Sequence, residues 1–409
     1  MKQTDAVNNT DLETPSTSNK EPEPIFEPVK SSVSVGVTCK PDTKDQTCQT
    51  AKPAASHMVR LSVQNKILKN SMKEPAGSYE MKKPRKQSSA EGSPAKKASE
   101  KFNLESLKND DKMCKFYTGL TFLQFMCLWN FLGDCTKKIN FWNSTVSNLD
   151  KTPSKRPGPK RAISPINQLF MTLVRLRLGL LHQDLSYRFG TNTRQVSTVI
   201  MTWIQLLYKQ FSSLRRIMFA SRSKIRKHLP KSFKKYKNIR CIIDCTEVHV
   251  QSPGNFEAQG NQYSSYKGYT SYKFLIAVAP NGAIVYVSDA FEGSISDKEI
   301  VIQSGFLDHL EPGDVIMADR GFLIEDLLNE RQVKLIKPPF LGSRHRFTPQ
   351  EEALTKDIAK HRIHVERSIE RMKKFKILQR IVPQSLQPVF SQMVFVIACL
   401  VNFQDPLVK

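Results

Sequence analysis

The succession of apolar runs after Arg240 constrains the fold of this chain most strongly. Runs rich in β-branched residues alternate with helical patterns, and Pro280-Asn281-Gly282 joins two runs as a hairpin, because Asn and Gly tolerate positive φ. The pattern predicts strands at 241–250, 272–279, 283–288, 314–318 and 334–337, and helices near 298–310, 324–331, 350–378 and 389–403. We therefore expect an α/β domain over residues 240–409, with a mixed sheet flanked by helices.

Three carboxylates occupy distinctive positions on this frame. Asp244 lies within the first strand, where an unpaired buried charge is costly, Asp319 closes the strand 314–318, and Glu366 lies on the long helix. Three convergent carboxylates suit two Mg²⁺ ions about 4 Å apart, which activate water and stabilise the leaving oxygen of a phosphodiester. The alternative interpretation is a turn or cap role for Asp319 and a surface ion pair for Glu366, with Glu370 as a rival for the inward position.

Residues 163–213 carry the pattern of three helices. Ser164 and Pro165 form a helix start, a short helix follows at 183–189, and Thr193 is the expected cap of a third helix. This arrangement is typical of a helix-turn-helix domain, in which the early residues of the last helix face DNA, here Arg194, Gln195 and Thr198. An ordinary three-helix packing unit without DNA contacts explains the same pattern.

Positive charge is concentrated in the part of the chain expected to fold. The 62 Lys and Arg outnumber the 38 Asp and Glu, and of the net +24 only +4 lies in residues 1–113. A folded surface this basic repels itself unless a polyanion binds it, and nucleic acid is the commonest such partner. Residues 214–239 carry only basic charges and no acid, which suits phosphate contacts or, alternatively, a solvated basic linker.

The remaining segments limit the class of protein to which this chain can belong. Residues 1–113 are poor in aromatics and are predicted to form a disordered basic and polar arm, and residues 114–162 a short helical segment and linker. Basic clusters at 82–86 and 155–161 favour the nucleus, although solvated linkers have similar composition. The eight cysteines include no Cys-x2-Cys pair, which favours a reducing compartment over a zinc finger. The apolar stretch 389–403 is shorter than the roughly 20 residues of a membrane span, so we expect no membrane association.

From about Tyr117 onward the chain resembles the transposases of the PIF/Harbinger superfamily, which contain a DDE endonuclease domain. Five short motifs carry the resemblance in the same order, namely IDCTE at 243–247, YKGYTSYK at 266–273, GSISDK at 293–298, ADRGF at 318–322 and VER at 365–367. The intervals from Asp244 to Asp319 and from Asp319 to Glu366, 75 and 47 residues, are compatible with that family. Residues 116–120 and 173–190 likewise resemble the helix-turn-helix region that precedes this domain.

The resemblance implies an RNase H-like fold, dependence on Mg²⁺ or Mn²⁺ with two ions, and cleavage and joining of DNA strands. On the matching positions, Asp244, Asp319 and Glu366 form the catalytic and metal-binding triad. Asp297 in the GSISDK motif is expected to support or cap rather than to bind metal. Three basic residues of the motifs are expected to contact DNA, namely Lys267, Lys273 and Arg367. The zinc-binding module that precedes the domain in some related proteins has no matching Cys/His set in this sequence.

We therefore predict a nuclear, metal-dependent DNA endonuclease or transposase. DNA is the expected partner, and the prediction also allows a separate DNA-binding protein and a second copy of the chain. Fold alone does not decide activity, so the alternative is a host-retained DNA-binding or recruitment protein that keeps the fold but does not cleave. A nuclease acting on RNA or single strands is a third interpretation.

Overall fold

The computed structural model describes residues 102–137, 139, 141 and 162–408. Residues 102–113 were predicted to belong to the disordered arm, and this is wrong. The Phe102 ring packs against Tyr117 and Phe189 at centroid distances of 5.1 and 5.2 Å, and Leu104 is buried. Local composition did not reveal this packing because its partners lie in the helices that follow. The rest of the predicted arm, residues 1–101, lies outside the described residues, as does the basic cluster at 155–161.

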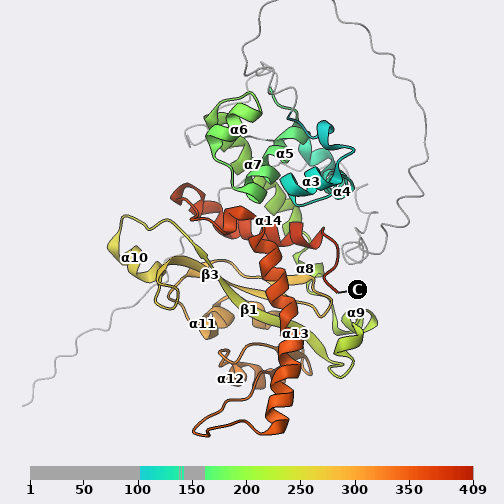
Figure 1. The fold of residues 1–409 in the computed structure, drawn as a ribbon, viewed down its shortest axis with the longest axis vertical. Coiled ribbons are helices and arrows are strands. Elements are labelled where there is room, and N and C mark those ends of the chain that lie inside the picture. The colour runs from blue at the N-terminus through green and yellow to red at the C-terminus, as the bar shows by residue number, and fades with distance from the viewer. Residues whose placement is uncertain (1–101, 138, 140, 142–161, 409) are drawn as a thin grey trace, which may run out of the picture. The chain divides into compact units, whose positions relative to one another are not determined.

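A seven-stranded mixed sheet forms the centre of the C-terminal part, which confirms the predicted fold class (Figure 1). The strand order is β2-β3-β1-β6-β7, with β4 and β5 also paired to β3. β1 is antiparallel to β3 and parallel to β6, which is parallel to β7. The strands are β1 (Ile239–His249), β2 (Tyr263–Ser264), β3 (Tyr269–Val278), β4 (Ile284–Val287), β5 (Phe291–Glu292), β6 (Val315–Met317) and β7 (Lys334–Ile336). The two-residue strands β2 and β5 were not predicted, because so short a strand has no recognisable pattern.

Helices cover both faces of this sheet. Successive strand residues point to opposite sides, and in β1 the residues on both sides are apolar and need to be buried. Ile242 belongs to the buried cluster that includes Val365 of α13 (Pro349–Lys373), whereas Ile243 belongs to the cluster that includes Ile300 of α11 (Asp297–Gln303). The other helical elements of this part are α10 (Phe256–Gln262), η5 (Phe306–His309), α12 (Glu325–Asn329), η6 (Lys376–Leu378), η7 (Gln384–Val389) and α14 (Phe390–Asn402). The helix predicted near 298–310 is divided into α11 and η5, since Gly305 has a φ of +74°.

Five α-helices and two short 3-10 turns precede the basic segment in the described part. They are η2 (Glu105–Leu107), α3 (Asp111–Thr118), α4 (Phe122–Leu132), η3 (Gly133–Thr136), α5 (Pro165–Leu178), α6 (His182–Arg188) and α7 (Thr193–Ser212). The last three agree with the predicted helix-turn-helix pattern. The cap of α7 differs from the prediction: the Asn192 side chain accepts a hydrogen bond from the Gln195 amide at 2.8 Å, and Thr193 is already helical. Trp203 of α7 is fully buried and donates to Gln168 of α5 at 3.1 Å.

The basic segment 214–239, predicted as a basic linker, contains short helices, and most of its Lys and Arg side chains are exposed. It contains α8 (Arg215–Met218), α9 (Arg222–Lys227) and η4 (Lys231–Phe233). Phe233 is fully buried and packs on His361 of α13 at 4.5 Å between ring centroids. Arg222 pairs with buried Asp314 at 3.1 Å. Partners far away along the chain stabilise the segment, and local composition carries no sign of them.

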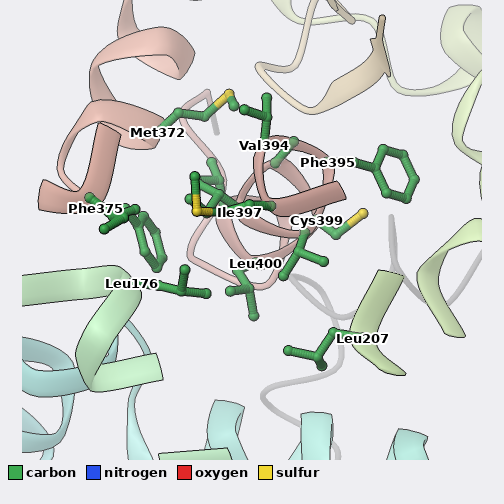
Figure 2. Packing of buried hydrophobic residues seen from close by; sticks show 14 of the residues in the cluster. Leu176, Leu207, Met372, Phe375, Val394, Phe395, Ile397, Cys399 and Leu400 are labelled. Carbon is green, nitrogen blue, oxygen red and sulfur yellow. The ribbon is translucent and has the colours of Figure 1, made fainter. Parts of the chain in front are cut away.

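The closing helix α14 lies in the main buried cluster, as predicted. Figure 2 shows Val394, Ile397 and Leu400 of α14 together with Leu176 of α5 and Leu207 of α7, all of them buried. Residues Gln384–Asn402 are long and apolar enough to span a membrane, but most of this stretch is buried inside the protein. Its apolar character is therefore accounted for by packing against the helix-turn-helix and the sheet.

Candidate active site

The register of β1 against β6 places Asp244 and Asp319 side by side. Ile242 of β1 pairs with Met317 of β6 in parallel register. Asp244 lies two residues after Ile242, and Asp319 lies two residues after Met317. Because side chains two residues apart share one face of a strand, both carboxylates belong to the face that α13 covers. β6 ends at Met317, so Asp319 stands at the carboxyl end of its strand, where α/β sheets build their sites.

α13 brings Glu366 to the same place through an arginine. The Arg362 guanidinium lies 3.0 Å from Asp319 Oδ1 and 3.6 Å from Glu366 Oε1. Arg362 and Glu366 are one helical turn apart and therefore lie on the same side of α13. The side chains of Asp319 and Glu366 are 51% and 56% exposed, whereas that of Arg362 is only 14% exposed. The two acids are thus open to solvent above a largely buried cation.

Glu370, the alternative to Glu366 for the inward position, forms an exposed ion pair with Lys374 at 3.0 Å. The neighbouring histidines are occupied elsewhere: His361 contacts the carbonyl oxygens of Asp357 and Ser232, and the His364 ring packs on Phe233. Glu366 is therefore the acid of this helix segment that faces Asp319.

Asp244 is the most buried member of the triad. Burial raises the pKa of its carboxyl to about 6, and the nearby Arg362 opposes this increase. The carboxylates of Asp319 and Asp297 add to it by repulsion. These influences show that Asp244, Asp319 and Arg362 share one electrostatic neighbourhood. A carboxyl group whose pKa is raised by burial beside specific charged partners is typical of functional sites.

Asp319 and Glu366 meet around the Arg362 guanidinium, which also acts electrostatically on Asp244, and the three acids are not at direct metal-binding distance from one another. In the part of the chain that the structure describes, no three Asp, Glu, His or Cys side chains are grouped closely enough to hold a metal ion. The donor set is nevertheless suitable, because carboxylate oxygens are the hard ligands that Mg²⁺ and Mn²⁺ accept. Arg362 bound between Asp319 and Glu366 also marks a position that favours positive charge.

Asp297 belongs to the other face of the sheet. It lies in the first turn of α11, and its carboxylate pairs with Lys273 of β3 at 2.6 Å. Phe274, the next residue of β3, faces α13, so Lys273 points to the opposite face of the sheet. Cys245, which interacts with both Lys273 and Asp297, packs against the buried cluster of α11 on that opposite face. This geometry agrees with a supporting role for Asp297.

The predicted DNA-binding residues of the helix-turn-helix lie at the start of α7. Arg194 is exposed and carries a cation into solvent. Gln195 is half-buried and its side chain accepts a hydrogen bond from the Thr191 hydroxyl. Thr198 is half-buried one turn later. Of the three, Arg194 is the side chain best placed for a phosphate.

The predicted DNA-binding residues of the nuclease part differ in availability. Lys267 is exposed and lies over the Tyr266 ring at 4.6 Å, and Arg367 is exposed on α13. Lys273 is only 15% exposed and donates to the Ile295 carbonyl as well as pairing with Asp297. Lys273 is therefore engaged inside the protein.

Sequence reasoning missed two basic residues of the site, Arg362 and Lys373. Lys373 lies on the same side of α13, seven residues after Glu366, and its half-buried amine is close enough to Asp244 to interact with it. Burial and Lys267 lower the pKa of Lys373, and Asp244 and Glu247 oppose the change. The sequence contained a signal for both residues. Arg362 lies four residues before Glu366 and Lys373 seven residues after it, and side chains at these intervals lie on the same face of a helix.

Comparisons with known families agree with this geometry. Residues 243–402 match the DDE superfamily endonuclease domain, and residues 161–213 match the helix-turn-helix of DDE superfamily endonucleases. No curated protein and no solved structure matches the chain significantly. The two matches support a transposase-like endonuclease of the DDE superfamily, with a helix-turn-helix domain upstream of the nuclease domain.

Proposed function

We propose that this protein is a divalent-metal-dependent DNA endonuclease with Asp244, Asp319 and Glu366 as its catalytic triad. The observation that carries the proposal is the meeting of acids from β1, the end of β6 and α13 around the Arg362 guanidinium. The match to the DDE superfamily endonuclease supports the same assignment, and the Harbinger motifs of the sequence refine it.

The triad would hold Mg²⁺ or Mn²⁺, two ions in the full site. Such ions lower the pKa of an attacking water and neutralise charge on the leaving 3′ oxygen. The strands β1 and β6 fix Asp244 and Asp319 relative to each other through their register. The exposure of Asp319 and Glu366 leaves room for a phosphodiester to approach from solvent.

The helix-turn-helix would position the duplex, with Arg194 at the exposed start of α7 and Lys267 and Arg367 nearer the triad. Phosphate contacts fix the register of a protein on DNA and carry no sequence information directly, so a separate protein partner for specificity remains part of the proposal. Assembly with a second copy is compatible with it. A nuclear location rests on the basic clusters at 82–86 and 155–161, which lie outside the described residues.

The test is nicking of supercoiled plasmid by the full chain in Mg²⁺. We expect Asp319→Asn to abolish nicking and to leave duplex binding intact. Asp326→Asn is the matched control, since Asp326 is an exposed acid of α12 paired with Lys298. Wild-type nicking that survives unchanged in Asp319→Asn would refute the triad.

One observation favours a second candidate, a DNA-binding protein without nuclease activity. Arg362 already pairs with two of the three acids, so these two are held together without a metal ion. In that case, wild-type protein would bind duplex DNA with a steep salt dependence and would fail to nick it in either Mg²⁺ or Mn²⁺.

A further inference from the structure

The Arg362 side chain occupies the centre of the acidic site. It makes ion pairs with Asp319 and Glu366 and interacts with Asp244, while its own Nε is buried without a hydrogen-bond partner among the described residues. Its burial contrasts with the exposure of the two acids that it contacts. Arg362 therefore lies beneath these carboxylates and not on the outer surface of α13.

A guanidinium keeps its charge at every pH at which a protein folds, so Arg362 cannot release the acids by losing a proton. A divalent ion at the triad would bind the same two carboxylates, of which Arg362 contacts one oxygen each, Oδ1 of Asp319 and Oε1 of Glu366. Two cations on one carboxylate repel each other, and an arginine side chain has rotatable bonds whereas the strand backbones are held by the sheet. We therefore expect metal binding to displace Arg362 from at least one carboxylate.

We propose that Arg362 is a tethered counter-ion that competes with the divalent metal for the triad. In the metal-free protein it suppresses repulsion among the acids and so stabilises the fold, and it correspondingly weakens metal binding. Its role is positioning and regulation of the site rather than contact with the reacting phosphate. This inference rests on the proposed function, because it assumes that the triad is the metal site.

The test compares Arg362→Gln with Lys374→Gln in the full chain. Both substitutions remove one positive charge from α13 or its end, but Lys374 pairs with the exposed Glu370, away from the triad. Mn²⁺ is titrated into each metal-free protein, and the electron paramagnetic resonance signal of the free ion gives the Kd. Thermal unfolding in EDTA and in saturating Mn²⁺ is a second readout that needs no catalysis.

We expect Arg362→Gln to lower the Kd for Mn²⁺ by about 3- to 30-fold, because two partly exposed ion pairs no longer compete. Its melting temperature in EDTA should fall, and the rise on adding Mn²⁺ should exceed that of wild type. Lys374→Gln should match wild type in both measurements. An unchanged or higher Kd in Arg362→Gln would overturn the inference.

Asp319→Asn separates failure of this inference from failure of the proposed function. If Asp319→Asn loses Mn²⁺ binding while Arg362→Gln binds like wild type, the metal site stands and the competition by Arg362 is refuted. If Asp319→Asn binds Mn²⁺ as wild type does, the triad is not the metal site, and the inference falls with the proposed function.

Discussion

The ion-pair network around Asp314 allows a sharp test of how the basic segment is attached to the sheet. Asp314 directly precedes β6 and is fully buried. It lies 3.1 Å from Arg222 of α9 and 3.8 Å from Arg240 of β1, and its Oδ2 accepts from the Glu311 amide at 2.9 Å. Arg240 is itself only 4% exposed. Asp314→Asn therefore leaves Arg222 without its closest anion and buried Arg240 with Glu311 as its remaining anion, and it preserves the size of the side chain.

Removing one partner of a buried ion pair destabilises a protein by about 3–5 kcal/mol. We expect the lower end of that range here, because Glu311 remains 3.6 Å from both arginines and is partly exposed. Arg222→Gln should give a smaller loss, since Arg222 is more exposed than Arg240. In the double variant the two losses should not add, because both substitutions remove the same pair.

Urea denaturation followed by far-ultraviolet circular dichroism measures this loss. Among the described residues the tryptophans are Trp129 and Trp203, both in the helical domain, so fluorescence would not report on the sheet. Asp326→Asn removes an exposed acid from the Lys298 pair and should leave the midpoint nearly unchanged. A midpoint for Asp314→Asn no lower than that of Asp326→Asn would refute the view that the basic segment is anchored through Asp314.

Three further predictions follow from single positions. Arg194→Ala should weaken duplex binding and reduce the slope of log K against log salt by about one, measured by fluorescence anisotropy, because we propose that this exposed cation contacts a phosphate. An unchanged slope would contradict this. Gly282→Ala should destabilise the fold by more than about 1 kcal/mol in thermal unfolding, and by more than Gly268→Ala does. Both glycines have positive φ, but only at Gly282 would the added Cβ lie within 2.6 Å of Leu407. Burial raises the thiol pKa of Cys241 and Cys399, so both should resist iodoacetamide in the native protein and react in urea, as peptide mass spectrometry will show.

The order of strands and helices could be predicted from the sequence because each main strand is a separate apolar run. The strands β1, β3, β4, β6 and β7 and the helix α13 all lie where their patterns indicated. The start of α7 was harder to predict, since Asn192 and Thr193 are both good capping residues. The extended backbone of Asn192, with φ −104° and ψ 158°, decides between them, and a sequence does not contain that information.

The basic segment shows why composition alone was insufficient. Arg215 to Arg240 contain eleven Lys and Arg and no acid, and most of these side chains are exposed, as the composition indicates. Composition did not reveal three exceptions, which pair with acids far away along the chain: Arg222 and Arg240 with Asp314, and Lys235 with Asp357 of α13. Arg362 escaped prediction for a related reason. Its one-turn spacing from Glu366 was visible, but its contact with Asp319 depends on how α13 docks on the sheet.

Successive side chains of β1 point to opposite faces of the sheet, and the acids discussed here lie on one face or the other. Even-numbered Asp244 shares the α13 side with Asp319, while odd-numbered Cys245 lies with Asp297 and Lys273 on the α11 side. A shift of one residue in the register would exchange these groups, because the side-chain period of a strand is two. On the α11 side, Lys273 pairs with Asp297 in a largely buried contact. On the α13 side, the counter-ion is Arg362, a largely buried arginine beneath two exposed acids. The sheet thereby gives Asp297 and the Asp319–Glu366 pair separate basic partners on its two faces.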